Sequence, residues 1–152
     1  MKNYIKENAI KSFLANLVVN TLIPTVILWN ASTILLKDDN STFIKNVVPP
    51  VLFSIIMTSI ITFFTLTHER KKGVVALSIS PNASWFPKAL LNGILVGICF
   101  AILTLGLVIL YQNSNENFEI PKLHFILISA FFCAIIASLA SIILAKRAAK
   151  IS

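Results

Sequence analysis

The sequence predicts an all-α integral membrane protein, built as a bundle of four transmembrane helices with both termini on the cytoplasmic side. Three observations predict it: an apolar composition, four long uncharged runs and a one-sided distribution of basic residues. Hydrophobic residues make up 57% of the chain and charged residues 12%, with a mean hydropathy of +0.85. A soluble domain carries about a quarter charged residues. This chain therefore lacks the polar side chains to cover a globular surface, and we expect one membrane domain over residues 1–152.

Four runs without Asp, Glu, Lys or Arg are long enough to cross a bilayer, whose core of about 30 Å requires about 20 helical residues. The runs cover residues 12–36, 46–67, 89–111 and 123–145. Pro87 is tolerated near the start of the third helix, because the first helical NH groups have no partner in any case. We expect helices over residues 12–36, 46–67, 87–112 and 123–145, with a cytoplasmic interfacial loop over 68–86.

The basic residues set the expected orientation, because Lys and Arg in short loops accumulate on the cytoplasmic face. Ten of the 13 lie in the N-terminal segment, the central loop or the C-terminal segment. The loops over residues 37–45 and 112–122 hold the other three, beside four acidic residues. We therefore expect both termini to be cytoplasmic, in the cell (plasma or inner) membrane. The net charge of +7 follows from this placement and forms no continuous basic stripe for nucleic acid.

The two halves of the chain share the same order of segments, which we call the hairpin pattern, or rhythm: an apolar helix, a short outer loop, a second apolar helix and a basic cluster. Asn20 and Asn92 fall at similar places in the first and third runs, and Phe43 and Phe118 close similar outer loops. Because each half holds two spans, both copies would insert in the same direction, as a parallel tandem repeat. The alternative is that all two-span hairpins share this rhythm under the same insertion rules.

The first helix carries a candidate polar pocket. Asn16 and Asn20 lie one turn apart, and Pro24 has no NH to donate to the carbonyl of Asn20, which frees that carbonyl and favours a kink. Joined by Asn92 of the third helix, these groups would form a polar pocket in the inner half of the membrane. Polar groups at membrane depth are costly and favour a functional role, although ordinary hydrogen bonding between helices uses the same residue types.

The second helix carries a candidate hydroxyl stripe. Its members follow one another at spacings of four, four and three residues and therefore share one face: Ser54, Thr58, Thr62 and Thr65. Such a stripe can line a narrow path for water or a small solute. The alternative, which the pattern favours, is that each hydroxyl bonds the carbonyl one turn earlier.

Small residues mark candidate packing faces, because helices in lipid associate through close backbone approach. Gly93 and Gly97 form a Gly-x-x-x-Gly pair in the third helix. The fourth helix carries two rows of small residues at four-residue spacing: Ala130, Ala134 and Ser138, and Cys133, Ala137 and Ser141. We expect the third and fourth helices to pack on each other through these faces, with a dimer interface as the alternative.

No catalytic, metal-binding or nucleotide-binding motif is present in the sequence, so we expect no enzyme activity, no metal ion and no cofactor. The apolar runs contain no carboxylate, which argues against a proton-driven exporter.

The first functional hypothesis is an accessory or assembly subunit, whose packing faces bind a second copy of the chain or a membrane partner. The alternative is a small transporter or passive pore for a small solute or ion, with a polar path along the first two helices. In both cases the lipid bilayer is the surrounding partner and nucleic acid is not one.

Overall fold

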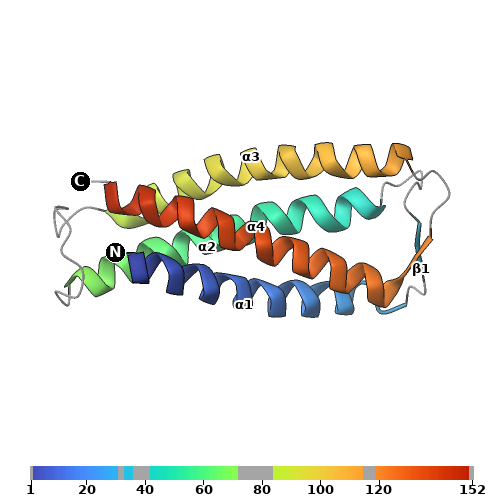
Figure 1. The fold of residues 1–152 in the computed structure, drawn as a ribbon, viewed down its shortest axis with the longest axis horizontal. Helices are drawn as coiled ribbons and strands as arrows, with labels where there is room; N and C mark the ends of the chain where they lie inside the picture. Colours follow the sequence, from blue (N-terminus) through green and yellow to red (C-terminus); the bar gives the residue numbers. More distant parts are fainter. Residues whose placement is uncertain (1, 31–32, 36–41, 72–83, 115–118, 151–152) are drawn as a thin grey trace.

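The computed structural model describes residues 2–30, 33–35, 42–71, 84–114 and 119–150. Four long helices run up and down between the two ends of an elongated bundle (Figure 1): α1 (Lys2–Ile27), α2 (Thr42–Lys71), α3 (Trp85–Ser114) and α4 (Lys122–Lys150). Each is long and apolar enough to cross a membrane. The prediction of a helical, multi-pass membrane protein is confirmed at this level. Both chain termini lie at one end of the bundle, which we call the termini end.

The opposite end carries two short strands, β1 (Thr33–Leu35) and β2 (Glu119–Pro121), and we call it the sheet end. The strands pair antiparallel, with Ile34 opposite Ile120. β1 lies between α1 and α2, and β2 lies between α3 and α4, so the pair ties the two hairpins together.

The first helix ends earlier than its apolar run. We expected a helix over residues 12–36, but α1 begins at Lys2, within the charged N-terminal segment, and ends at Ile27, where the chain turns before β1. The turn is closed by the Leu28 amide on the Pro24 carbonyl at 2.8 Å and by the Trp29 amide on the Val26 carbonyl at 3.3 Å. An apolar run indicates that a segment is compatible with lipid, but it does not determine the backbone conformation of that segment. The β-branched residues beyond the turn favour a strand.

The remaining helices are longer than their uncharged runs. α2 extends into the basic cluster after its apolar run as far as Lys71, α4 extends through its own basic cluster to Lys150, and α3 begins at Trp85, before Pro87. Charged flanks continue a helix beyond the apolar segment, because only the membrane-spanning part must be apolar. Of the expected interfacial loop over 68–86, residues 68–71 belong to α2 and Trp85 and Phe86 to α3, while residues 72–83 lie outside the described residues.

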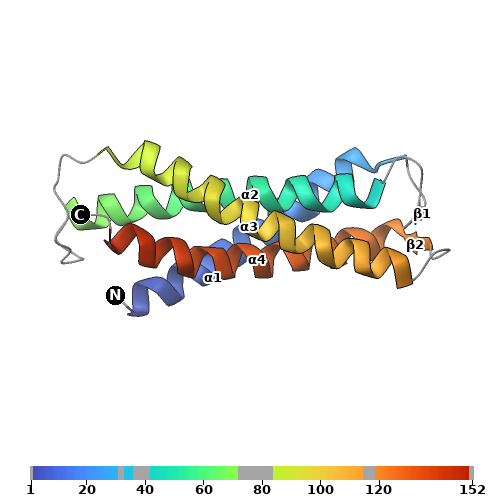
Figure 2. The same cartoon turned by 90° about the horizontal axis from the view of Figure 1, so that it is seen from above.

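The helices pack in an offset arrangement, with α2 and α4 in the middle of the bundle between α3 and α1 (Figure 1). Seen from above, α1 and α3 cross the bundle obliquely (Figure 2). α1 lies along α4, α3 lies along α2, and α2 and α4 also pack on each other. The α1–α2 and α3–α4 pairs make far fewer close backbone approaches. Two interhelical spaces follow from this arrangement, one between α1 and α2 and the other between α3 and α4.

Gly93 and Gly97 of α3 face α2. A Cβ atom added at Gly93 would lie 2.9 Å from the Cβ of Ser59 and 3.1 Å from the Cα of Ile56. The expected packing of the third helix on the fourth is therefore corrected: the glycines serve the α2–α3 contact. Small-residue spacing identifies a face suited to close approach but carries no information about which helix will occupy it.

The small rows of α4 are used inside the bundle as well. Ala130, Cys133, Ala134, Ala137 and Ser141 are buried, and Ser138 is half-buried. The carbonyl of Ala137 accepts a hydrogen bond from Ser12 of α1 at 3.3 Å, whereas Cys133 belongs to the core shared with α2 and α3. The two rows thus let α4 approach the helices on both of its sides.

Candidate polar site between α1 and α2

α1 presents polar side chains to α2 once per helical turn. They are Asn8, Ser12, Asn16 and Asn20. The facing side of α2 carries three residues with buried hydroxyl groups: Ser54, Thr58 and Thr62. Because the two helices run antiparallel, both sets follow the same line along the bundle. We call these seven residues the polar seam.

The ends of the seam are formed by two direct pairs. Near the termini end, the Asn8 amide donates to the Thr62 hydroxyl at 3.0 Å. Farther along, the Asn20 side-chain amide donates to the Ser54 hydroxyl at 3.1 Å, and the Ser54 hydroxyl lies 3.4 Å from the side-chain oxygen of Asn20, to which it can donate. All four residues are buried.

The middle of the seam centres on Thr58. Its hydroxyl lies 3.3 Å from the hydroxyl of Ser12 and accepts a hydrogen bond of 3.3 Å from the Asn16 amide. Asn16 also donates to the carbonyl of Ser12 at 2.9 Å. Side chains, rather than close backbone packing, therefore hold α1 to α2.

A groove of about 170 Å³ follows the seam from the termini end as far as Asn16 and Thr58. Thr65 lines it together with most of the seam, and Glu7, Lys11 and Glu69 also contribute to its walls. A single water molecule needs only about 10–15 Å³ of such space and two or more polar partners, so the groove has room for several waters or a small solute. We call it the α1–α2 groove.

Tyr4 lines the same groove. Its hydroxyl oxygen is buried and has no hydrogen-bond partner among the described residues. Buried polar groups are nearly always paired, so this hydroxyl is a candidate contact for a molecule that occupies the groove.

The structure joins two features that the sequence presented separately. Asn16 and Asn20 bond to members of the hydroxyl stripe, and Thr65 lines the adjoining groove. Sequence reasoning missed Asn8 and Ser12 because Asn8 lies before the uncharged run and Ser12 at its first position. Extending the four-residue spacing of Asn16 and Asn20 backwards would have found both.

Asn92 does not join this site. Its amide donates to the carbonyl of Lys88 at 2.8 Å, and its side-chain oxygen accepts a hydrogen bond from Arg147 at 3.2 Å. Pro24 is buried in α1, one turn beyond Asn20. The expected pocket therefore retains its two α1 asparagines, while Asn92 connects α3 to α4.

Other chemistry-bearing side chains lie apart from the seam. Cys99 is exposed and Cys133 is buried, and both are free thiols. Within the described ranges, no three His, Cys, Asp or Glu side chains are grouped so that they can hold a metal ion. No protein-family model, curated protein or solved structure matches the chain. The polar seam and the α1–α2 groove are therefore the features of this chain that bear on its function.

Proposed function

We propose that the chain is a non-enzymatic membrane protein that admits a small polar solute or ion into the α1–α2 groove. One observation carries the proposal: in a surface rich in exposed apolar side chains, one interhelical space is lined by amides and hydroxyls and is large enough to be occupied. Asn, Ser and Thr side chains both donate and accept hydrogen bonds. They can therefore exchange a bond within the seam for a bond to a solute.

The residues of the seam have distinct roles in this proposal. Asn8, Ser12, Asn16, Thr58 and Thr62 offer polar contacts along the groove. Passage beyond them to the sheet end requires the Asn20–Ser54 pair, which follows one turn later, to separate. The seven seam residues include no titratable side chain, and the two carboxylates that line the groove, Glu7 and Glu69, lie outside the uncharged runs. We therefore propose a path that is not driven by protons, because proton-coupled carriers use ionisable groups at membrane depth.

Flux in liposomes tests the proposal. The purified chain would be reconstituted, and shrinkage or swelling would be followed with water and glycerol as neutral probes and K⁺ as an ion. We expect at least one probe to cross faster than through protein-free liposomes, and Asn16→Leu to abolish the difference. The matched control is Leu14→Ala, because Leu14 is exposed on α1 away from the groove. Flux that persists in Asn16→Leu with normal expression and oligomer size would reject the groove as the path.

We also propose that both termini face the cytoplasm, which makes the groove open to that side. The excess of Lys and Arg in the terminal segments and the central loop supports this orientation. Cysteine tags added at each terminus would then react with an impermeant reagent only in inside-out vesicles of the cell membrane. Reaction in intact cells would reverse the assignment.

We further propose that the two hairpins arose by tandem duplication. The helix contacts are reciprocal, since α1 lies along α4 as α3 lies along α2, and β1 pairs with β2. That pattern is what two parallel repeats related by an axis along the bundle would produce. Homologous sequences aligned over the first hairpin should resemble those of the second at one common shift, and a lack of similarity at every shift would contradict the duplication.

An accessory or assembly subunit is the second candidate, favoured by the outer face of α1. The residues Leu14, Val18, Leu22 and Val26 follow one another at four-residue spacing and are all exposed. Such a stripe suits a helix of a second copy or of a membrane partner. The oligomeric state in nanodiscs decides: a stoichiometric partner that copurifies and is lost in Val18→Trp would support this role, whereas a monomer without a partner would count against it.

A further inference from the structure

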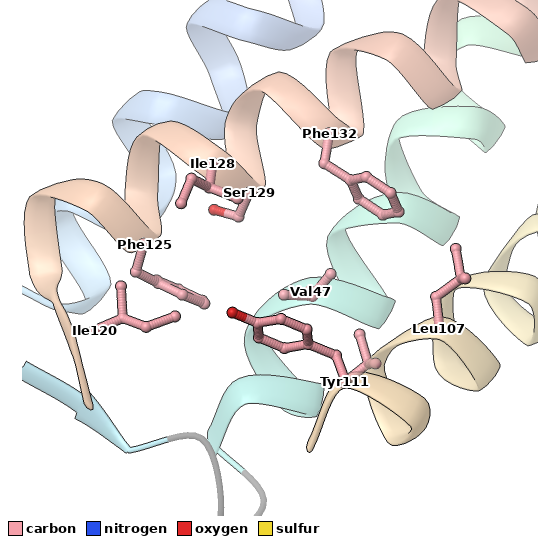
Figure 3. Close-up of a pocket in the computed structure, with 9 residues that line it drawn as sticks. Val47, Leu107, Tyr111, Ile120, Phe125, Ile128, Ser129 and Phe132 are labelled. Atoms are coloured by element: carbon pink, nitrogen blue, oxygen red, sulfur yellow. The ribbon is translucent and has the colours of Figure 1, made fainter. Parts of the chain in front are cut away.

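A second cavity, of about 230 Å³, lies between α3 and α4 at the sheet end. Figure 3 shows Tyr111 of α3 and Phe125 of α4 pointing into the same space, with Val47 of α2 behind them. The cavity exists because α3 packs along α2 and α4 packs along α1. α3 and α4 therefore approach each other at few points.

The wall of this cavity is almost wholly apolar. Val47, Val108, Ile120 and Phe125 are buried and form its inner surface. Ser129 adds little polarity, because its hydroxyl already donates to the carbonyl of Ile126 at 3.1 Å. The Tyr111 hydroxyl is the other polar side-chain group of the lining (Figure 3). Two hydroxyls on an otherwise apolar wall do not form a set of polar groups that would recognise a charged or strongly polar ligand.

The mouth of the cavity opens onto the apolar outer surface. Leu107 of α3 and Ile128 of α4 line it and are exposed, as is Tyr111. In a membrane these side chains face lipid hydrocarbon, so alkyl chains surround the mouth. Lys122 and His124, at the start of α4, belong to the same end of the bundle, where cationic and aromatic residues favour the headgroup level.

The size and chemistry of the cavity match a hydrocarbon chain. Cavities of about 150 Å³ lined by Leu, Ile and Phe stay dry and bind benzene, and this cavity is larger, with a similar lining. A dry void leaves its lining atoms without contacts on one side. An alkyl chain restores those contacts and requires no hydrogen bond.

We propose that the α3–α4 cavity binds a single acyl chain of a membrane lipid, which enters sideways between Leu107 and Ile128. This proposal is independent of the α1–α2 groove, which lies between the other pair of helices and at the other end. The occupant is a lipid chain rather than a second copy, because the inner wall of the cavity is made of buried side chains, which a flexible chain can reach and a helix of a second copy cannot.

Photolabelling in nanodiscs tests the proposal. The full chain would be reconstituted with a phosphatidylcholine that carries a diazirine at the end of one acyl chain, and labelled residues would be mapped by peptide mass spectrometry. We expect label on the buried residues Val108 and Phe125, which are only 6% and 2% exposed, in addition to the exposed apolar faces. Label confined to exposed residues would overturn the proposal.

Matched variants sharpen the test. Val108→Phe fills the cavity, whereas Ile109→Phe adds the same ring at a neighbouring position that does not line the cavity. We expect the first to lower labelling of Phe125 by about tenfold and the second to leave it unchanged. Ser129→Leu fills the cavity from α4 and would replace Val108→Phe in this test if Val108→Phe does not fold. Unchanged labelling in a folded filling variant, or crosslinks between two copies at Phe125, would reject the lipid site.

Discussion

Asn20 of α1 and Ser54 of α2 form a reciprocal hydrogen-bonded pair, one turn beyond the last residues that line the α1–α2 groove. Both side chains are 5% exposed. The pair therefore closes the deep end of the groove, where a polar group left without a partner would be costly.

The Asn20–Ser54 pair should show measurable coupling. A double-mutant cycle with Asn20→Leu, Ser54→Ala and the double variant would be followed by unfolding in detergent. Hydrogen bonds between membrane helices are worth about 0.6 kcal/mol on average in such cycles, and we expect a coupling of about this size. The corresponding cycle between Asn20 and Ser59 is the control, because Ser59 donates to Ala89 instead. Equal coupling in both cycles would argue against the pair.

Substitutions of Asn92 and Asn16 should have different effects on flux. Asn92 bonds Lys88 and Arg147 and does not line the groove, so Asn92→Leu should lower stability slightly and leave flux unchanged. Asn16→Leu should abolish flux through the loss of a lining amide. The two substitutions are chemically identical, which makes each a control for the other. Loss of flux in both would point to a general defect in folding.

Gly93 and Gly106 should respond oppositely to alanine. A Cβ at Gly93 meets Ser59 and Ile56 within 3.1 Å, whereas a Cβ at Gly106 meets nothing within 4 Å. Gly93→Ala therefore forces α2 and α3 apart, and overpacking of this kind costs about 1–3 kcal/mol. Gly106→Ala should be neutral or slightly stabilising, because alanine is the better helix former. Thermal unfolding in detergent would compare them, and equal stability of the two variants would contradict the α2–α3 contact.

Much of the architecture is predictable from the chain, because the physics of insertion acts on single helices. The four apolar runs predict four helices, since each span must satisfy its own backbone groups in lipid. The choice of neighbours is less predictable: Gly93 indicates a close contact without naming α2 as its partner. The end of α1 at Ile27 also escapes prediction, because residues 33–35 are apolar enough to continue a helix and instead pair with β2.

The candidate site was predictable in its parts rather than as a whole. The spacing of Asn16 and Asn20, and of Ser54, Thr58 and Thr62, indicates two polar faces. Their meeting depends on the relative rotation of α1 and α2, which arises from the packing of both helices on α4. Asn92 has the same residue type but lies on α3, which packs on α2 and α4 rather than on α1, and its side-chain oxygen accepts a hydrogen bond from Arg147. Residue type alone does not distinguish the two situations.

Replacing Thr104 with valine should stabilise the protein. It is fully buried in α3, and its hydroxyl has no hydrogen-bond partner among the described residues. An unsatisfied buried group costs about 1–3 kcal/mol, so Thr104→Val, which keeps the shape, should raise the unfolding temperature. Ser59→Ala should lower it, because Ser59 donates to the Ala89 carbonyl at 2.7 Å. A lower unfolding temperature in Thr104→Val would show that the hydroxyl has a partner in the membrane.

The most direct test of the central claim is the reactivity of cysteines placed along α1. In a background with Cys99 and Cys133 replaced by alanine, Asn8, Ser12, Asn16, Asn20 and Leu14 would each be changed to cysteine and exposed to a small hydrophilic methanethiosulfonate. We predict reaction at positions 8, 12 and 16, which line the groove, and at position 20, where cysteine removes the hydrogen bonds to Ser54 that close it. We predict protection at the outward-facing position 14. Protection at all five positions would contradict the claim that the α1–α2 groove admits polar solutes.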